Sequence, residues 1–333
     1  MSHGRVLADK KIKGETMPSN IKTNLICLIL VAIGFSFITY SQAKLGSSEG
    51  FVETPKGKIW YKIYGSGEEI PLLLIHGGPG GRSCRLTPIT ELSSERPVIL
   101  YDQLGSGKSD RPSDTTIWHL QRFVDELDIL IDSLHLNKVH ILGHSWGSAL
   151  AVEYFLTKKP EKVKSLILVG PLLSTSLWLE DANYLRKQLP DSVQQVLKFC
   201  EQEGLVESKE YFSATDYFYD RHMYRIKPIP EYPECGDSDF NEVVYKQMWG
   251  PSEFYCSGNL INFDRINRLN EITVPVLLLL GEYDEVRLET LLKIQKLFST
   301  AQIEVIRDAA HMSMVDQPEE FNRIVRRFIR SIK

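Results

Sequence analysis

The chain has 333 residues, 43% of them hydrophobic, and a formal net charge of −4. This length suits one large α/β domain with an insertion, or two domains, and the apolar fraction is ordinary for a globular protein. The slightly negative charge excludes the basic footprint of a nucleic-acid-binding protein.

The N-terminal segment, residues 1–45, differs in kind from the rest. Residues 1–24 are polar and basic, residues 25–38 form a nearly continuous apolar run, and Ser41-Gln42-Ala43 supplies small residues suited to signal peptidase. These features describe a secretory signal peptide beginning at Met1 or Met17. The apolar run is short for a membrane span, which needs about 20 residues. We therefore expect export to the periplasm or the medium, with a membrane anchor at residues 21–40 as the alternative.

Strands and helices alternate through the next part of the chain. Residues 51–54 and 58–64 predict a β-hairpin around Pro55-Lys56-Gly57. The following segments predict strands at 71–75 and 97–101, a helix at 117–134, a strand at 138–142, a helix at 148–156 and a strand at 163–170. Continuous apolar runs of this kind suit a sheet that is buried on both faces.

The alternation stops at residues 172–265, which are polar, aromatic and helical in character. It resumes with a strand at 274–281, a helix at 288–298, a strand at 301–306 and an amphipathic helix at 318–332. The pattern predicts an α/β fold with a mostly parallel sheet flanked by helices. Its core would comprise residues 46–171 and 266–333, with an inserted helical cap at residues 172–265.

Gly143-His144-Ser145-Trp146-Gly147 is a G-x-S-x-G pentapeptide between a predicted strand and a predicted helix. In this context the pattern is typical of a nucleophile elbow, which exposes a serine on a sharp turn. The glycines leave room for the turn, and the helix N-terminus favours developing negative charge. We therefore predict a catalytic role for Ser145 rather than a structural Gly-Ser turn.

A serine hydroxyl is a weak nucleophile and needs a base that a third group orients. In elbow proteins an acid and then a histidine follow the serine in the chain. Only His222 and His311 follow Ser145, and His222 lies in the predicted cap. His311, just past the last predicted strand, is therefore the predicted base.

The predicted acid is Asp284, because it directly follows the strand at 274–281 and so lies at the same edge of the sheet. Glu282 and Glu285 are its local rivals. Asp308 is close to His311 in the sequence but lies past the last strand, which makes it a weaker candidate.

A tetrahedral intermediate needs two backbone donors. We assign one to the N–H of Trp146 and the other to Gly78, in the glycine-rich loop at residues 76–81. This loop lacks the G-K-[ST] ending of a phosphate-binding loop. Residues 102–109 resemble a phosphate loop too, but no Walker-type helix follows, and we interpret them as a turn that shapes the pocket floor.

Beyond Cys27 in the apolar run, four cysteines allow three pairings: Cys84, Cys200, Cys235 and Cys256. A bridge such as Cys235–Cys256 is one option, but free, buried thiols are the favoured interpretation. No C-x-x-C or His/Cys spacing indicates a metal site.

Several motifs together resemble the α/β-hydrolase fold and, more narrowly, the proline iminopeptidase family. They span about residues 46–333 and comprise His76-Gly77-Gly78-Pro79-Gly80, Asp102-Gln103, Gly143-x-Ser145-Trp146-Gly147-Ser148, Gly281-x-Tyr283-Asp284 and Ala310-His311. The chain departs from the family at Leu104, where arginine is frequent, and at His144, where glycine is common. The cap around residues 211–225 is also diverged.

The resemblance implies a serine aminopeptidase that releases an N-terminal residue and needs no cofactor. Residues 249–254 are similar to the family's Gly-Pro-x-Glu-Phe segment, whose glutamate binds the α-amine of the substrate; Glu253 is the corresponding residue. A second carboxylate is usual, and Asp216, Glu210 and Glu231 are the candidates. The alternative is a carboxylesterase acting on a small acyl substrate with the same three residues. The complete set of serine, aspartate and histidine disfavours a non-catalytic receptor module on this fold. The sequence leaves the oligomeric state open.

Overall fold

The computed structural model describes residues 47–158, 161–236 and 240–332. The predicted leader or anchor, including Cys27, lies outside the described residues. Within the described ranges, no helix is long and apolar enough to cross a membrane.

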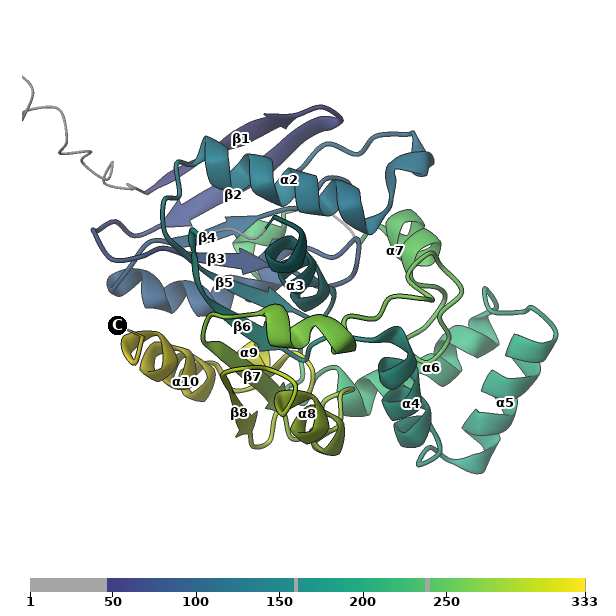
Figure 1. Ribbon diagram of the computed structural model, residues 1–333. Coiled ribbons are helices and arrows are strands. Elements are labelled where there is room, and N and C mark those ends of the chain that lie inside the picture. The colour runs from purple at the N-terminus through teal and green to yellow at the C-terminus, as the bar shows by residue number, and fades with distance from the viewer. Residues whose placement is uncertain (1–46, 159–160, 237–239, 333) are drawn as a thin grey trace, which may run out of the picture. The chain divides into compact units, whose positions relative to one another are not determined.

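A mostly parallel sheet of eight strands organises the described chain, in the order β1-β2-β4-β3-β5-β6-β7-β8 (Figure 1). β1 and β2 form the predicted antiparallel hairpin and β2 pairs antiparallel with β4, whereas the strands from β4 onward run parallel. The strand bounds are β1 Ser48–Thr54, β2 Gly57–Tyr64, β3 Leu72–Ile75, β4 Val98–Tyr101, β5 Val139–His144, β6 Val163–Val169, β7 Val276–Gly281 and β8 Ala301–Ile306. Every predicted strand is confirmed.

Helices cover both faces of the sheet because alternate side chains of the buried strands point to opposite sides. Leu73 and Ile141 face a core shared with α2, α3 and α8, whereas Leu74 and Leu142 face a second core shared with η1, α9 and α10. The helix bounds are η1 Ser83–Ser94, η2 Thr115–Ile117, α2 Leu120–Ser133, α3 Trp146–Lys158, α8 Leu288–Gln295, α9 Ser313–Asp316 and α10 Pro318–Arg330. η1, a 3₁₀ segment that contains Pro88, was not predicted from the sequence.

The predicted helix at 117–134 begins later than expected. His119 is extended, and its side chain accepts a hydrogen bond from the backbone N–H of Arg122 at the start of α2. The preceding residues form the short η2 turn instead.

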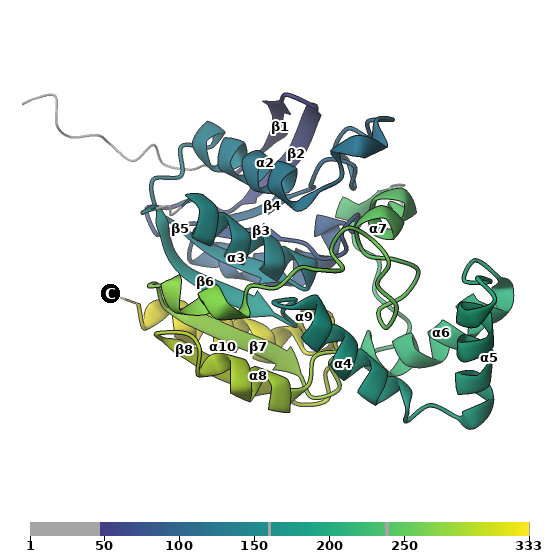
Figure 2. The ribbon, with the colours of Figure 1, turned by 45° about the vertical axis from the view of Figure 1, so that its right-hand side comes forward.

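The chain between β6 and β7 is helical, as predicted, and lies beside one end of the sheet (Figure 2). It contains α4 Thr175–Arg186, α5 Asp191–Gln202, α6 Lys209–His222, η3 Pro233–Cys235, α7 Glu242–Met248 and η4 Ile266–Glu271. The division of the chain at residues 172 and 265 stays a prediction.

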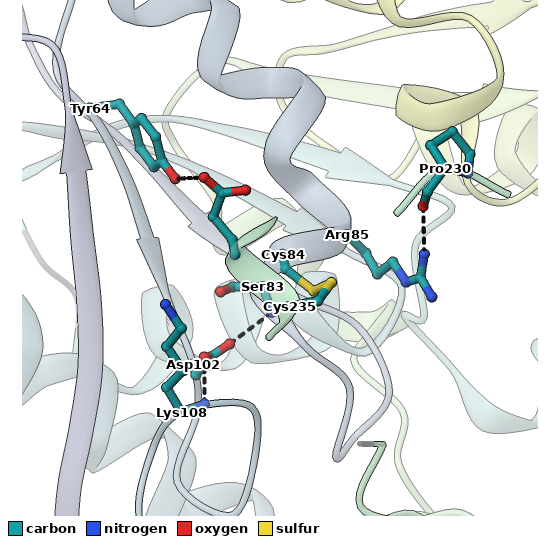
Figure 3. The surroundings of a disulfide bond; sticks show 9 residues. Tyr64, Ser83, Cys84, Arg85, Asp102, Lys108, Pro230 and Cys235 are labelled. Atoms are coloured by element: carbon teal, nitrogen blue, oxygen red, sulfur yellow. Dashed lines mark hydrogen bonds between the residues drawn. A yellow bond between two sulfur atoms is a disulfide. The ribbon is translucent and has the colours of Figure 1, made fainter. Parts of the chain in front are cut away.

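The favoured expectation of free cysteines is wrong for one pair. Cys84 in η1 and Cys235 in η3 form a disulfide across 151 residues of sequence (Figure 3). Cys200 and Cys256 are free and buried, so the suggested Cys235–Cys256 bridge is wrong as well. Nearness in the sequence was misleading because the fold brings η3 of the insertion onto η1 of the core.

Candidate active site

Ser145 occupies the sharp turn that the pentapeptide predicted. β5 ends at His144 and α3 begins at Trp146, which leaves Ser145 between them with a positive φ of 54°. A side chain at Gly147 would lie 2.3 Å from the carbonyl oxygen of Ile75, so the close approach of α3 to β3 requires glycine there. A non-glycine residue in this backbone region is strained, and such strain is concentrated at functional sites.

His311 and Asp284 are brought together as predicted. The Nδ1 atom of His311 lies 2.7 Å from Oδ1 of Asp284, and both side chains are buried. Asp284 is held in turn by the backbone N–H groups of Gly281 and Val286. Because Asp284 holds Nδ1, the Nε2 atom of His311 is the nitrogen free to exchange a proton with a substrate or a nucleophile.

Neighbouring side chains enclose the His311 ring. The indole of Trp178 meets it edge-on at 5.6 Å between ring centroids. His144 lies 4.5 Å away between centroids, and its Nε2 atom is 3.1 Å from the carbonyl oxygen of His311. Burial holds the pKa of His144 well below its usual value, so His144 is neutral and adds no charge beside His311.

The rival acids and the rival histidine have other partners. Glu282 accepts a hydrogen bond from the backbone N–H of Asp308. The Nδ1 atom of His222 lies 2.9 Å from the carbonyl oxygen of Tyr283, while the carbonyl of His222 accepts from the backbone N–H of His311. The insertion therefore helps to position His311 without supplying the base.

Glu285 is the remaining rival, and its position was not foreseen. It is fully buried, and Oε2 lies 3.6 Å from Nε2 of His311. Within the described part of the chain, neither of its carboxyl oxygens has a hydrogen-bond partner. Burial, followed by the nearby charge of Glu253, raises its pKa well above the usual range. An unpartnered buried carboxyl group is costly, which points to a ligand that completes it.

The glycine-rich loop is fixed to the elbow by Gln103. The backbone N–H of Gln103 donates to Nε2 of His76, and its side-chain amide donates to the carbonyl oxygen of His76. The side-chain oxygen of Gln103 accepts from the indole N–H of Trp146, at 2.9 Å. The Asp-Gln motif thus holds the loop carrying Gly78 against the first residue of α3, whose own N–H has no acceptor within the helix.

The turn at residues 102–109 has a different role from the one expected. Asp102 accepts from the backbone N–H groups of Ser83 and Lys108, each at 2.9 Å (Figure 3). Among the described residues, none of this turn lines the pocket. The turn supports the pocket from behind, by fixing the start of η1, rather than forming its floor.

A cavity of about 550 Å³ extends from Ser145 to the insertion. Ser145, His311 and Gly78 line it from the core, and Glu253 lines it from the insertion. Glu253 keeps partial exposure on this side, accepts a hydrogen bond from the hydroxyl of Tyr245, and has a raised pKa because of burial. This volume is typical of a pocket for a small ligand.

The candidates for a second carboxylate do not share one location. Asp216 lines the cavity but is exposed, whereas Glu210 and Glu231 are exposed and do not line it. Glu285 is the better partner for Glu253, because it is buried and the nearby charge of Glu253 contributes to its raised pKa. In the sequence, the signal that could have identified Glu285 was its position directly after Asp284. No cluster suited to a metal ion occurs among the described residues.

The chain is similar in sequence and fold to several known proteins. The family model described as alpha/beta hydrolase fold matches residues 70–318. The proline iminopeptidase of Heyndrickxia coagulans is 42% identical over 287 residues, covering 86% of this chain and 99% of that protein. The crystal structure of VinJ has a TM-score of 0.80 at 31% identity, covering 87% of this chain and 100% of that one. The proline iminopeptidase structure from Mycobacterium smegmatis has a TM-score of 0.77 at 31% identity, covering 85% and 98%.

Proposed function

This chain belongs to the proline iminopeptidase family of α/β hydrolases, and we propose that it is a serine aminopeptidase that releases N-terminal proline from peptides. The observation that carries the proposal is the shared cavity. A carboxylate from the insertion, Glu253, lines the same space as Ser145 and His311. The substrate of a simple esterase has no ammonium group that this carboxylate could bind.

The chemistry follows from the positions of the side chains. Ser145 Oγ attacks the carbonyl carbon of the first peptide bond, and His311 accepts the hydroxyl proton at Nε2. Asp284 holds the Nδ1–H and stabilises the imidazolium. The backbone N–H groups of Gly78 and Trp146 stabilise the oxyanion. His311 then gives the proton to the leaving nitrogen, and water, activated by the same histidine, releases proline from Ser145.

Recognition of the free amine is assigned to Glu253 and Glu285. Glu285 is buried and Glu253 is partly buried, and desolvation raises the pKa of each, so a nearby cation is needed to stabilise their ionised forms. The ammonium group of an N-terminal residue supplies that cation. A peptide that binds with an internal bond at Ser145 has no ammonium group at this position. The two carboxyl groups would then have no cation to bind.

A panel of chromogenic substrates tests the proposal. Proline, alanine and leucine linked to one chromophore are compared as free amines and as N-acetylated forms, beside a simple acyl ester. We expect turnover of the free proline substrate and large losses on acetylation. Equal turnover of free and acetylated amides, or faster turnover of the ester, would replace the aminopeptidase assignment with a general acyl hydrolase.

We also propose that the protein is exported. The apolar run at residues 25–38 has the pattern of a signal peptide, and the Cys84–Cys235 disulfide is of a kind that persists in oxidising compartments. Fractionation of cells producing the full chain, with N-terminal sequencing of the mature form, tests this proposal. Retention of an uncleaved chain in the cytoplasm would contradict it, and an uncleaved chain in the membrane fraction would support the anchor.

A further inference from the structure

The backbone at His311 is fastened to the insertion. The N–H of His311 donates to the carbonyl oxygen of His222 at 2.9 Å, and the N–H of Met312 donates to the carbonyl oxygen of Met223 at 3.0 Å. His222 is the last residue of α6, and Met223 directly follows it. The position of the proposed base therefore depends on where the end of α6 lies.

The carboxylate of Asp316 makes a second attachment between the same two segments. Asp316 is the last residue of α9, and its side chain is buried. Its Oδ2 atom accepts a hydrogen bond, at 2.8 Å, from the backbone N–H of Ala310, directly before His311. Its Oδ1 atom accepts from the backbone N–H groups of Arg225, at 2.9 Å, and Ile226, at 3.0 Å. One carboxylate thus joins the loop that carries the base to the segment that follows α6.

The donors around Asp316 require two acceptor oxygens at this position. All three partners are backbone N–H groups, and the two oxygens of an ionised carboxylate can accept from all of them. A side-chain amide has one oxygen, so asparagine would direct an NH2 group either at Ala310 or at residues 225–226. A buried N–H without an acceptor is costly, so one of the two segments would have to shift.

The same segment of the insertion also reaches the loop that carries the acid. The Nδ1 atom of His222 lies 2.9 Å from the carbonyl oxygen of Tyr283, which directly precedes Asp284. The guanidinium of Arg225 lies over the ring of Tyr283, 4.2 Å from its centroid. Residues 222–226 therefore contact both the loop of the acid and the loop of the base.

The remaining contacts of His311 do not replace this attachment. Asp284 holds the ring at Nδ1, and Nε2 of His144 lies 3.1 Å from the carbonyl oxygen of His311. Neither contact involves the N–H groups of residues 310–312, which bond to Asp316 and to the insertion. A displacement of about 1 Å at a reacting group can cost about a hundredfold in rate, so the position of this backbone matters for proton transfer.

We propose that Asp316 is a positioning residue for the hydrolase reaction: its carboxylate places His311 by holding Ala310 against residues 225–226 of the insertion. The inference rests on the proposed function, in which His311 is the base. Asp316 is not one of the described residues that line the cavity, so it acts through His311 and not by touching the substrate. Its loss should slow proton transfer from Ser145 more than it weakens substrate binding.

Asp316→Asn tests the inference, because it keeps the size of the side chain and removes one acceptor. We expect kcat on the free proline substrate to fall about ten- to a hundredfold, with KM changed by less than about threefold. Asp316→Glu keeps both oxygens but displaces them by one methylene group, and its kcat should be intermediate. Asp264→Asn is the matched control and should keep the wild-type kcat. Asp264 is exposed, and it accepts from the hydroxyl of Ser174 and the N–H of Ile266 at another attachment of the insertion.

Inactivation by a small fluorophosphonate separates this inference from the choice of substrate. The reaction needs Ser145, the base and the oxyanion donors but no free amine. A slower inactivation of Asp316→Asn than of the wild type, in protein with the wild-type circular dichroism spectrum, supports the positioning role. The same result without any release of proline would still support that role and remove only the proposed function.

Two results would overturn the inference. One is a wild-type rate of inactivation in Asp316→Asn or, if that variant does not fold, in Asp316→Glu. The other is a KM that rises while kcat stays unchanged, because Asp316 would then shape the insertion and leave the base in place.

Discussion

Removing the Cys84–Cys235 disulfide should destabilise the folded protein without unfolding it. The bond closes a loop of 151 residues and links η1 in the core to η3 in the insertion. For a loop of this length, the chain-entropy estimate gives a loss of about 5 kcal/mol, and measured effects of disulfides are usually about 2–4 kcal/mol. We therefore expect Cys84→Ala with Cys235→Ala to lower the free energy of unfolding by about 2–4 kcal/mol.

Urea unfolding followed by tryptophan fluorescence measures this loss, and thermal unfolding should show a fall in Tm of roughly 4–8 °C. Each single variant should cost about as much as the double variant, because either one removes the whole bond. Chemical reduction of the wild type should reproduce the same midpoint.

Either of two results would contradict this prediction. One is an oxidised wild type and a double variant that unfold at the same urea concentration. The other is alkylation of Cys84 in the denatured, unreduced protein, which would show that its thiol is free. Cys200 and Cys256, which are free and buried, should be alkylated only after unfolding and so provide the internal control.

Three further predictions concern the active site. Glu253→Gln should lower kcat/KM on free-amine substrates by about 2–5 kcal/mol, because a buried charge pair loses one partner, while Glu203→Gln on the exposed surface should not; an unchanged value would remove Glu253 from the site. Ser145→Ala should abolish turnover and fluorophosphonate labelling while the circular dichroism spectrum stays that of the wild type, and residual labelling would identify another nucleophile. Burial raises the pKa of Glu285 in the folded state, so its contribution to stability is present below its ordinary pKa of 4.5 and is lost as the pH rises through the raised pKa. Glu285→Gln should therefore unfold at a Tm that falls less with rising pH than the Tm of the wild type, and parallel curves would contradict the raised pKa.

Two of the proposed catalytic side chains, Ser145 and Asp284, could be located because each has a strong local signal in the sequence. Ser145 lies in a pentapeptide between a strand and a helix, and Asp284 follows a continuous apolar strand. The chain order of elbow proteins then left His311 as the candidate base. Parallel strands place their carboxyl ends at one edge of the sheet, so residues that follow different strands were expected to meet.

The contacts of Gln103 could not be predicted from its sequence motif. The sequence shows an Asp-Gln pair far from both the glycine-rich loop and the elbow. Only the folded chain shows that its amide joins His76 to Trp146. Side-chain hydrogen bonds between distant segments depend on the relative placement of whole strands, which no local pattern encodes.

The sequence by itself determined the fold class, the order of strands and helices, and the residues at the nucleophile, because hydrophobic periodicity and turn chemistry are local properties. The tertiary structure decided the disulfide partner of Cys84, the burial of Glu285 beside His311, and the meeting of Glu253 with Ser145 and His311 around one cavity. These depend on how the insertion packs on the core. Residues as far apart in the chain as Cys84 and Cys235, which are separated by 151 positions, become neighbours only when non-local contacts form.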